Sequence, residues 1–265
     1  MELLLPWLPG LFLLLGLLFG SLANVIIYRL PLMMGIHENG DDAGVNLWWP
    51  PSHCPSCKSD IKPRDNIPVL SWLLLRGKCR RCAAAIPAIY PLSELAMGLV
   101  WGALAFFGAP LSPVILLAWA LLFLLLYTAA VIDFKHLLLP DALVFSVLWG
   151  GLLLSVAGYS FIRPKDAVYG VVLAWLLLWC VMKLWCAFCK YEGLGNGDVK
   201  LFAAAGAWLG WQRLPELLLY SALLGLLCYA AIYFVTRGDG DKRPVYIPFG
   251  PAIALTAFTL VIIGR

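Results

Sequence analysis

The sequence predicts an all-α polytopic membrane protein of about eight transmembrane helices, with a small polar insert between the first two. Hydrophobic residues make up 62% of the 265 residues and charged residues only 13%, whereas soluble domains average about 45–50% and about 25%. The mean hydropathy is +0.88. Apolar runs near the length of about 20 residues that crosses a bilayer recur along the chain.

Eight runs are expected to be spans. They cover approximately residues 3–28, 91–108, 112–132, 138–158, 167–189, 199–213, 216–236 and 246–263. The first run has no basic segment before it and no small-residue cleavage site after it, so it is interpreted as a retained span and not as a signal peptide. The sixth is short and has Lys200 in its first turn, which favours a partial or tilted helix.

The placement of Lys and Arg predicts the orientation of these spans. With eight spans, one side of the membrane receives fourteen of the nineteen basic residues and the other side four. The richer side is expected to be cytoplasmic, and it holds the polar insert, Asp133 and Asp198, with both termini outside. The net charge of +4 therefore reflects topology, and no nucleic-acid partner is indicated.

The polar insert, residues 31–89, contains four of the eight cysteines. They form two C-x-x-C knuckles, Cys54-Pro-Ser-Cys57 and Cys79-Arg-Arg-Cys82, joined by 21 residues. This pattern favours a zinc-ribbon-like domain in which four thiolates hold one structural Zn²⁺ and leave no ligand position open. Two disulfides or four free thiols are the alternatives, and a cytoplasmic location disfavours disulfides. His53 is an alternative ligand that is better interpreted as a surface residue.

The other cysteines carry little functional signal. Cys186 and Cys189 also form a C-x-x-C pattern, but they lie at a span end between aromatic residues and are expected to be buried apolar thiols. Cys180 and Cys228 are lone residues within spans.

Asp198 is the most informative acidic residue. It ends the glycine-rich run Glu192-Gly-Leu-Gly195-Asn-Gly197-Asp198, between two apolar stretches. A carboxylate beside a span is expensive and predicts function when a partner can be named. Gly195 and Gly197 let the backbone turn tightly and approach another chain closely.

Asp133 is the best partner for Asp198. It ends the third span, where the helix dipole disfavours negative charge, so its presence suggests a functional reason. Asp141 follows Pro140 at the start of the next span, where an aspartate commonly caps a helix, and capping is the favoured interpretation. Lys200 either biases which aspartate holds the charge or is an interface lysine.

Two nearby carboxylates cannot both ionise easily, so they share a proton and titrate as a unit. One then takes a proton from water while the other protonates the carbonyl oxygen or the leaving amine. The pair therefore predicts an aspartic peptidase at the membrane face.

With these residues in view, the chain resembles the type IV prepilin peptidases, the leader peptidases and N-methyltransferases of type IV pilus and type II secretion systems. The resemblance covers nearly the whole chain. It rests on Gly20-Ser-Leu-Ala-Asn24, Arg29-Leu-Pro31, the double cysteine knuckle, Tyr90-Pro-Leu-Ser-Glu94, the segments of Asp133 and Asp198, and Ile247-Pro-Phe-Gly-Pro251. Leu194 stands where the family usually has Met, and Ile89 where it has Arg.

The resemblance implies cleavage of a prepilin or pseudopilin after the glycine that ends a short basic leader, at the cytoplasmic face of the bacterial inner membrane. It implies catalysis by Asp133 and Asp198. It also implies methylation of the new N-terminal residue from S-adenosylmethionine, with Gly77 and the cysteine region as candidates for that second site. Glu192 and Glu94 are candidates to attract the basic leader. The expected parts are residues 1–30, a first span; 31–89, a zinc-binding domain; and 90–265, the peptidase.

Three other functions were weighed against this one. A peptidase without the methyltransferase is the nearest, and the sequence does not exclude it. An ion-coupled transporter would place acids at mid-span and often shows repeat symmetry, but here both aspartates end spans and no internal repeat is visible. A zinc-binding scaffold without chemistry would leave the glycine-rich aspartate run unexplained.

Overall fold

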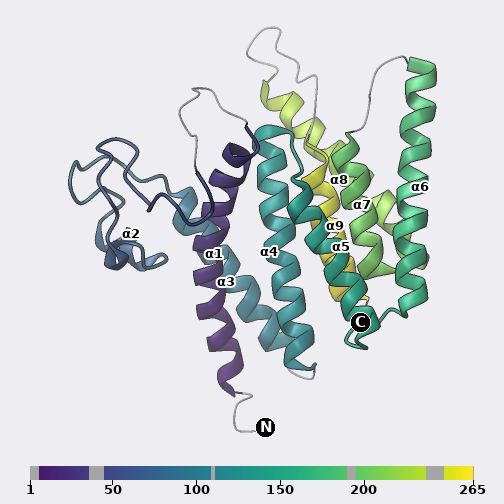
Figure 1. Cartoon of the computed structure of the whole chain (residues 1–265), viewed down its shortest axis with the longest axis horizontal. Helices are drawn as coiled ribbons and strands as arrows, with labels where there is room; N and C mark the ends of the chain where they lie inside the picture. Colours follow the sequence, from purple (N-terminus) through teal and green to yellow (C-terminus); the bar gives the residue numbers. More distant parts are fainter. Residues whose placement is uncertain (1–5, 36–44, 109–110, 190–194, 237–247, 265) are drawn as a thin grey trace. The chain divides into compact units, whose positions relative to one another are not determined.

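The computed structural model describes residues 6–35, 45–108, 111–189, 195–236 and 248–264, and most of them are helical (Figure 1). Within these ranges there is no β-strand, only two isolated bridges, which join His53 to Asp60 and Lys78 to Ala85. The all-α prediction is confirmed. The chain forms two compact units, residues 1–124 and 125–265, which are described separately below.

The helices occur in the predicted order. The first unit holds α1 (Leu8–Met33), the 3₁₀ turn η2 (Pro63–Asp65), α2 (Leu70–Leu74) and α3 (Ile89–Phe107). Helix α4 (Pro113–His136) runs from the first unit into the second. The second unit continues with α5 (Asp141–Val156), α6 (Pro164–Cys189), α7 (Asn196–Leu209), η3 (Trp211–Arg213), α8 (Leu214–Thr236) and α9 (Gly250–Ile263).

Five helical segments of the described chain are long and apolar enough to cross a membrane. They are Leu8–Met33, Ile89–Phe107, Pro113–His136, Pro164–Phe188 and Trp211–Ala231. Helices α5 and α9 are apolar but only 16 and 14 residues long, and α7 also has 14. The protein is therefore a multi-pass helical membrane protein, whereas the predicted count of eight spans is not confirmed.

Helices α1 and α3 pack closely because glycines line their contact. A Cβ atom at Gly16 would lie 2.8 Å from the Cα atom of Gly98, and one at Gly20 would lie 2.7 Å from the Cα atom of Glu94. Small residues four apart allow two backbones in a membrane to approach in this way. Next to this contact, the indole of Trp101 is fully buried and stacks on Phe19 at 4.9 Å between ring centroids.

The polar insert is fastened to both helices by buried charged side chains. Arg29 of α1 donates to the carbonyl oxygens of Asn46 and Leu47 at 3.0 and 3.3 Å and to that of Pro50 at 2.6 Å. Glu94 of α3 accepts a 2.8 Å hydrogen bond from the amide of Val69 through Oε2. The Arg29 guanidinium and the Glu94 carboxylate thus provide hydrogen-bond partners for main-chain groups of the insert.

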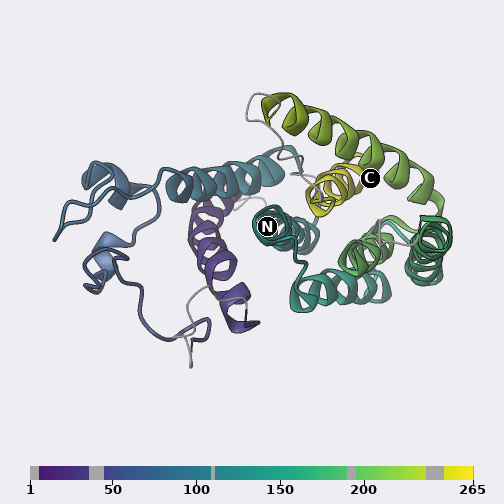
Figure 2. The same ribbon diagram turned by 90° about the horizontal axis from the view of Figure 1, so that it is seen from above.

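The second unit is built around α7. Figure 2 shows α9 between α8 and α7, with α5 and α6 also against α7, in agreement with the helix contacts. Every residue from 201 to 207 is buried, because the run Leu-Phe-Ala-Ala-Ala-Gly-Ala is apolar all round, the pattern of a helix enclosed by neighbours. Gly206 permits the closest of these contacts, since a Cβ atom there would lie 2.5 Å from the carbonyl oxygen of Gly170 in α6.

Candidate active site and metal centre

Asp133 lies in the last turn of α4 and is buried, with 5% of its surface exposed. Its Oδ2 atom accepts a 2.9 Å hydrogen bond from the amide of Gly250, the first residue of α9. Helix N-termini carry unpaired amides and partial positive charge. The N-terminus of α9 therefore offsets the unfavourable position of a carboxylate at the C-terminal end of α4.

Gly250 is required by this contact. A Cβ atom at residue 250 would lie 2.7 Å from Oδ2 of Asp133 and 3.0 Å from its Cγ. Sequence reasoning did not identify Gly250 as a site residue, because 117 positions separate it from Asp133. The signal that could have found it is its place in the segment Pro248-Phe249-Gly250-Pro251, part of which starts a helix.

Asp198 lies in the first turn of α7, close enough to Asp133 for the two carboxyl groups to interact electrostatically. Gly195 precedes the helix as its N-cap, and its carbonyl accepts a 3.1 Å hydrogen bond from the amide of Asp198. The charge of Asp133 acts on the Asp198 carboxyl group. Within the described residues, the buried Oδ1 atom of Asp198 has no hydrogen-bond partner. One oxygen of Asp133 is thus held by an amide, whereas Oδ1 of Asp198 is buried and unpartnered among the described residues.

The two glycines before Asp198 lie against different groups. A Cβ atom at Gly195 would lie 3.2 Å from Oδ2 of Asp198, and one at Gly197 would lie 2.9 Å from the Cβ atom of Leu139. Gly195 thus leaves room for the carboxylate, and Gly197 for the segment that leads into α5. The side chain of Glu192, predicted to assist, lies outside the described residues, as do Leu194 and Ile247.

Asp141 and Lys200 form an ion pair. The Nζ atom of Lys200 lies 2.7 Å from Oδ1 of Asp141, and both side chains are substantially exposed. The expectation that Asp141 caps α5 is wrong, because Pro140 occupies the N-cap position, Asp141 is the first helical residue, and no side-chain hydrogen bond caps the helix. Pro140 has no side-chain acceptor, and Asp141 pairs with the cation of α7 instead.

The four cysteines of the insert converge on one point. Their sulfur atoms all lie within 4.8 Å of one another, and the Sγ atoms of Cys54 and Cys82 are 3.8 Å apart. A disulfide needs about 2.05 Å, whereas thiolates at about 2.3 Å from a tetrahedral zinc ion lie about 3.8 Å apart. The arrangement therefore fits a metal held by four sulfurs. His53 is exposed, with Nδ1 3.2 Å from the carbonyl oxygen of Pro51.

The two knuckles repeat one backbone fold with an offset of 25 residues. Three backbone hydrogen bonds of residues 52–61 recur in residues 77–86. In the first segment they run from Cys54 N to Ser59 O, from Lys58 N to Cys54 O and from Ile61 N to Ser52 O. Their counterparts in the second segment run from Cys79 N to Ala84 O, from Ala83 N to Cys79 O and from Ile86 N to Gly77 O. The residue after each second cysteine, Lys58 or Ala83, has a positive φ of 54° or 57°. The metal centre thus contains a local repeat that the sequence did not reveal.

The thiols differ in acidity although their backbones match. The hydroxyl of Ser59, whose Oγ is 3.0 Å from Sγ of Cys57, lowers the pKa of Cys57 to about 6 together with the Ser59 amide. The amides of Cys82 and Arg81 lower the pKa of Cys79. The Ala84 amide acts in the same sense on Cys82, but desolvation and the three other thiols raise its pKa to about 11. Full ionisation of the cluster therefore calls for a cation such as Zn²⁺.

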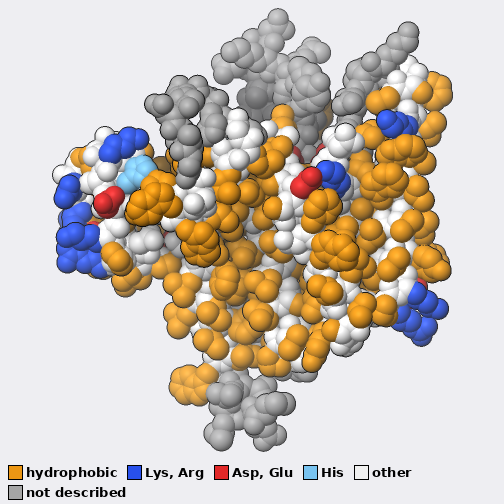
Figure 3. Space-filling view, in the orientation of Figure 1, with side chains coloured by type: hydrophobic (Ala, Val, Ile, Leu, Met, Phe, Trp, Pro, Cys, Tyr) orange, Lys and Arg blue, Asp and Glu red, His pale blue; other side chains and the backbone are white. Residues whose placement is uncertain are grey.

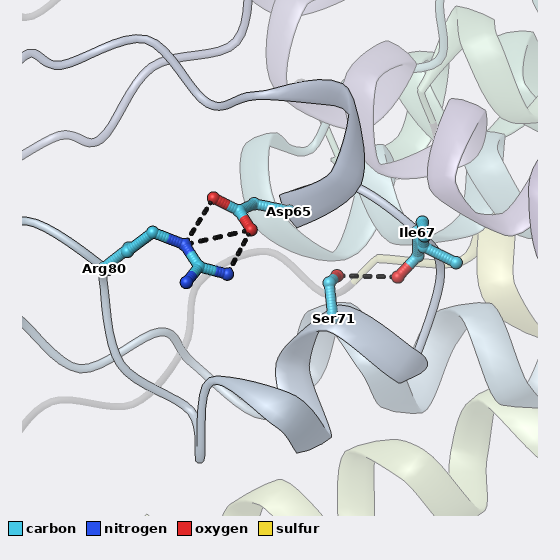
Figure 4. Close-up of polar contacts among 4 residues, drawn as sticks. All are labelled: Asp65, Ile67, Ser71 and Arg80. Carbon is cyan, nitrogen blue, oxygen red and sulfur yellow. Dashed lines mark hydrogen bonds and ion pairs between the residues drawn. The ribbon is translucent and has the colours of Figure 1, made fainter.

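Two further contacts shape the metal centre. Arg80, inside the second knuckle, donates to both carboxylate oxygens of Asp65 in η2, with the shortest contact 2.6 Å (Figure 4). This hydrogen bonding lowers the pKa of Asp65. Gly77 has a φ of +69°, and a Cβ atom there would lie 2.9 Å from the indole ring of Trp72. Trp72 in turn donates a 3.0 Å hydrogen bond to the carbonyl of Ile86.

Gly77 was expected to contact S-adenosylmethionine, and the structure gives it a different environment. It is buried, its conformation favours glycine, and the indole of Trp72 lies where its side chain would project. The space into which a side chain at residue 77 would project is therefore filled by the indole of Trp72.

These features define a class: a helical membrane protein that carries two aspartates at helix ends and a cluster of four cysteines that can hold a metal ion. Two family models match the chain, the Bacterial Peptidase A24 N-terminal domain over residues 14–107 and the Type IV leader peptidase family over residues 119–230. No solved structure matches the chain.

Several curated relatives match almost end to end. The prepilin leader peptidase/N-methyltransferase of Pectobacterium carotovorum subsp. carotovorum is 44% identical over 271 residues, which cover 94% of this chain and 91% of the relative. The proteins of the same name from Aeromonas hydrophila and Pseudomonas aeruginosa are 41% and 40% identical, covering 98% and 95% of this chain and 92% and 89% of theirs. The chain belongs to the type IV leader peptidase family.

Proposed function

We propose that this protein is a prepilin leader peptidase and N-methyltransferase of the bacterial inner membrane. It removes the short basic leader of a type IV prepilin or a type II secretion pseudopilin after a glycine, and methylates the new N-terminal residue. The observation that supports the first step most directly is the pairing of Asp133, held by the Gly250 amide, with Asp198, whose buried Oδ1 has no hydrogen-bond partner among the described residues.

The contacts suggest a division of labour between the two aspartates. The Gly250 amide donates to Asp133 and favours a carboxylate there, so the shared proton rests on Asp198. Asp133 takes a proton from a water molecule as the oxygen of that water attacks the scissile carbonyl carbon. Asp198 gives its proton to the carbonyl oxygen. When the tetrahedral intermediate collapses and the C–N bond breaks, Asp133 passes its proton to the leaving amine and Asp198 recovers a proton from the diol.

The other residues of the two sites have supporting roles in this proposal. Gly195 and Gly197 admit the substrate backbone beside Asp198, and the ion pair of Lys200 with Asp141 holds the start of α7 to the start of α5. Cys54, Cys57, Cys79 and Cys82 hold a structural Zn²⁺ that folds the insert. Glu94 is buried and bonded to Val69, so the attraction of a basic leader is assigned to Glu192 and the aspartates.

For the methyl transfer, S-adenosylmethionine supplies the methyl group. The N-terminal amine formed by cleavage would take this methyl group and lose a proton, and S-adenosylhomocysteine would be the product that leaves. With eight spans, the distribution of Lys and Arg supports an orientation in which the insert and both aspartates face the cytoplasm. The functional division into a first span, a zinc-binding insert and a peptidase of residues 90–265 follows from this topology.

The test is incubation of the purified protein with a prepilin and S-adenosylmethionine, followed by mass spectrometry of the product. The wild type is expected to remove the leader and add one methyl group. Asp133→Asn and Asp198→Asn are expected to abolish cleavage. Asp166→Asn is the matched control, because Asp166 accepts a hydrogen bond from Trp211 that asparagine can also accept.

Each outcome separates the proposal from its alternatives. Cleavage at the wild-type rate by either dyad variant would overturn the assignment of the pair. Cleavage without methylation would leave a peptidase alone, which is the second candidate function.

A further inference from the structure

The short helix α2 presents a leucine face that the insert does not cover. Leu70, Leu73 and Leu74 are 49%, 58% and 72% exposed, and positions i, i+3 and i+4 lie on one side of a helix. Ser71, about 100° around the helix from Leu70, is buried and donates a 2.6 Å hydrogen bond to the carbonyl of Ile67 (Figure 4). The leucine face therefore points away from the body of the insert.

The depth of α2 is fixed by the contact of Val69 with Glu94. The Val69 amide, one residue before α2, donates to the carboxylate of Glu94 at 2.8 Å. Glu94 is the sixth residue of α3, a candidate span, so it lies about 7–8 Å along the helix axis from the first residue. The leucine face is thus held level with the first turns of α3, a candidate membrane span.

The backbone conformation of Val69 also indicates that the surrounding structure fixes the position of α2. It has a φ of +60°, a conformation that is a genuine outlier for a β-branched residue and costs free energy. Such a conformation persists where the surroundings determine it, and here the hydrogen bond to buried Glu94 does so.

The residues around the leucine face are basic. Over the described part of the insert, residues 45–89, seven Lys and Arg residues stand against two Asp residues, and one of these, Asp65, is paired with Arg80. Lys62 and Arg64 precede α2, Arg76 and Lys78 follow it, and all four are exposed. In Figure 3 the basic side chains gather over the insert, beside hydrophobic side chains.

We propose that the leucine face of α2 is a membrane-docking surface, which inserts at the headgroup boundary of the leaflet facing the insert and is held there by anionic phospholipids. Apolar residues beside Lys and Arg at interfacial depth are the composition that binds such a surface. The bilayer is the chosen occupant because the Val69–Glu94 contact places α2 where lipid is the neighbour. This proposal is independent of the catalytic assignment.

The test places the photo-cross-linker p-benzoylphenylalanine at Leu74 of the full-length protein. The protein is reconstituted in nanodiscs of phosphatidylcholine alone or of phosphatidylcholine with phosphatidylglycerol, and adducts are identified by mass spectrometry after illumination. The same cross-linker at Ala85, an exposed position in the second knuckle that is not on the leucine face, is the matched control. Retained bound zinc shows that each variant keeps the insert folded.

We expect lipid adducts from position 74 and few from position 85, with phosphatidylglycerol over-represented among them. The double substitution Arg64→Gln with Arg76→Gln is expected to reduce the phosphatidylglycerol share, by about fivefold for each charge at the surface. Equal lipid labelling at positions 74 and 85, or labelling of another protein chain from position 74, would overturn the docking surface. Labelling of the two lipids in proportion to their abundance would overturn the choice of anionic lipid.

Discussion

The amide of Gly250 donates a hydrogen bond to the carboxylate of Asp133, and the start of α9 thereby fixes one half of the proposed catalytic pair. Gly250→Ala would place a Cβ atom 2.7 Å from Oδ2 of Asp133, so the carboxylate or the helix must move. Because small displacements of reacting groups are costly, we expect cleavage to fall by about 100-fold. The measurement is the rate of prepilin processing by the purified variant.

Gly150→Ala is the matched control for this substitution. Gly150 lies in α5, and a Cβ atom there would make an ordinary 3.5 Å contact with Trp208. It is expected to cleave at the wild-type rate. Unimpaired cleavage by Gly250→Ala would show that the α9 amide is not part of the active arrangement.

The ion pair of Lys200 with Asp141 is expected to contribute little to stability. Both side chains are more than one third exposed, and exposed pairs contribute roughly 0.2–1 kcal/mol. A double-mutant cycle of Lys200→Gln and Asp141→Asn, followed by thermal unfolding in detergent, is expected to give a coupling in this range. A coupling of several kcal/mol would show that the pair is much less hydrated than its exposure indicates.

Removal of one cysteine of the metal centre is expected to release zinc and loosen the insert without abolishing the catalytic pair. Because the two knuckles share one backbone fold, Cys57→Ser and Cys82→Ser should have similar effects. Bound zinc is measured by elemental mass spectrometry, and loosening by trypsin cleavage within residues 45–89. Cys228→Ser, which lies outside the cluster, should retain the metal. Full zinc occupancy in either knuckle variant would argue against four-sulfur coordination.

Glu94→Ala is expected to free the insert from α3, because the Val69 amide would lose its acceptor. An unsatisfied buried amide costs about 1–3 kcal/mol, which should appear as faster protease cleavage near α2. Glu94→Gln retains an acceptor and should remain close to the wild type. If the two variants were equally protected, the contact would not be what holds the insert.

The parts of this site that the sequence predicted are those with local signals. Asp133 and Asp198 stand out because each carboxylate adjoins an apolar run, and the cysteines because their spacing suits a metal. The all-helical fold follows from apolar runs whose length matches a bilayer. The number of spans could not be fixed in this way, since α7 is buried by other helices as well as apolar, and hydropathy does not distinguish lipid from protein as the neighbour.

The missed features depend on tertiary structure. Gly250 contacts Asp133 although 117 positions separate them in the sequence, so only the fold brings the start of α9 to the end of α4. The partner of Lys200 is 59 residues away. The repeat of the knuckles was hidden because, over residues 52–61 and 77–86, only the two cysteines and the final isoleucine are identical. Backbone hydrogen bonds preserve that repeat, and they place few demands on side-chain identity.

The enclosure of α7 has a consequence for where a substrate can be cut. Because residues 201–207 are buried on every side among the described residues, this part of α7 offers no free side to a substrate helix. Asp198 lies in the first turn, at the end of α7 that bears Gly195 and Gly197, and we expect a substrate to reach it from that end. A peptide must arrive there in extended form, outside its own helical stretch. The position of the scissile bond would then be set by its distance from the membrane surface and not by the length of the leader before it.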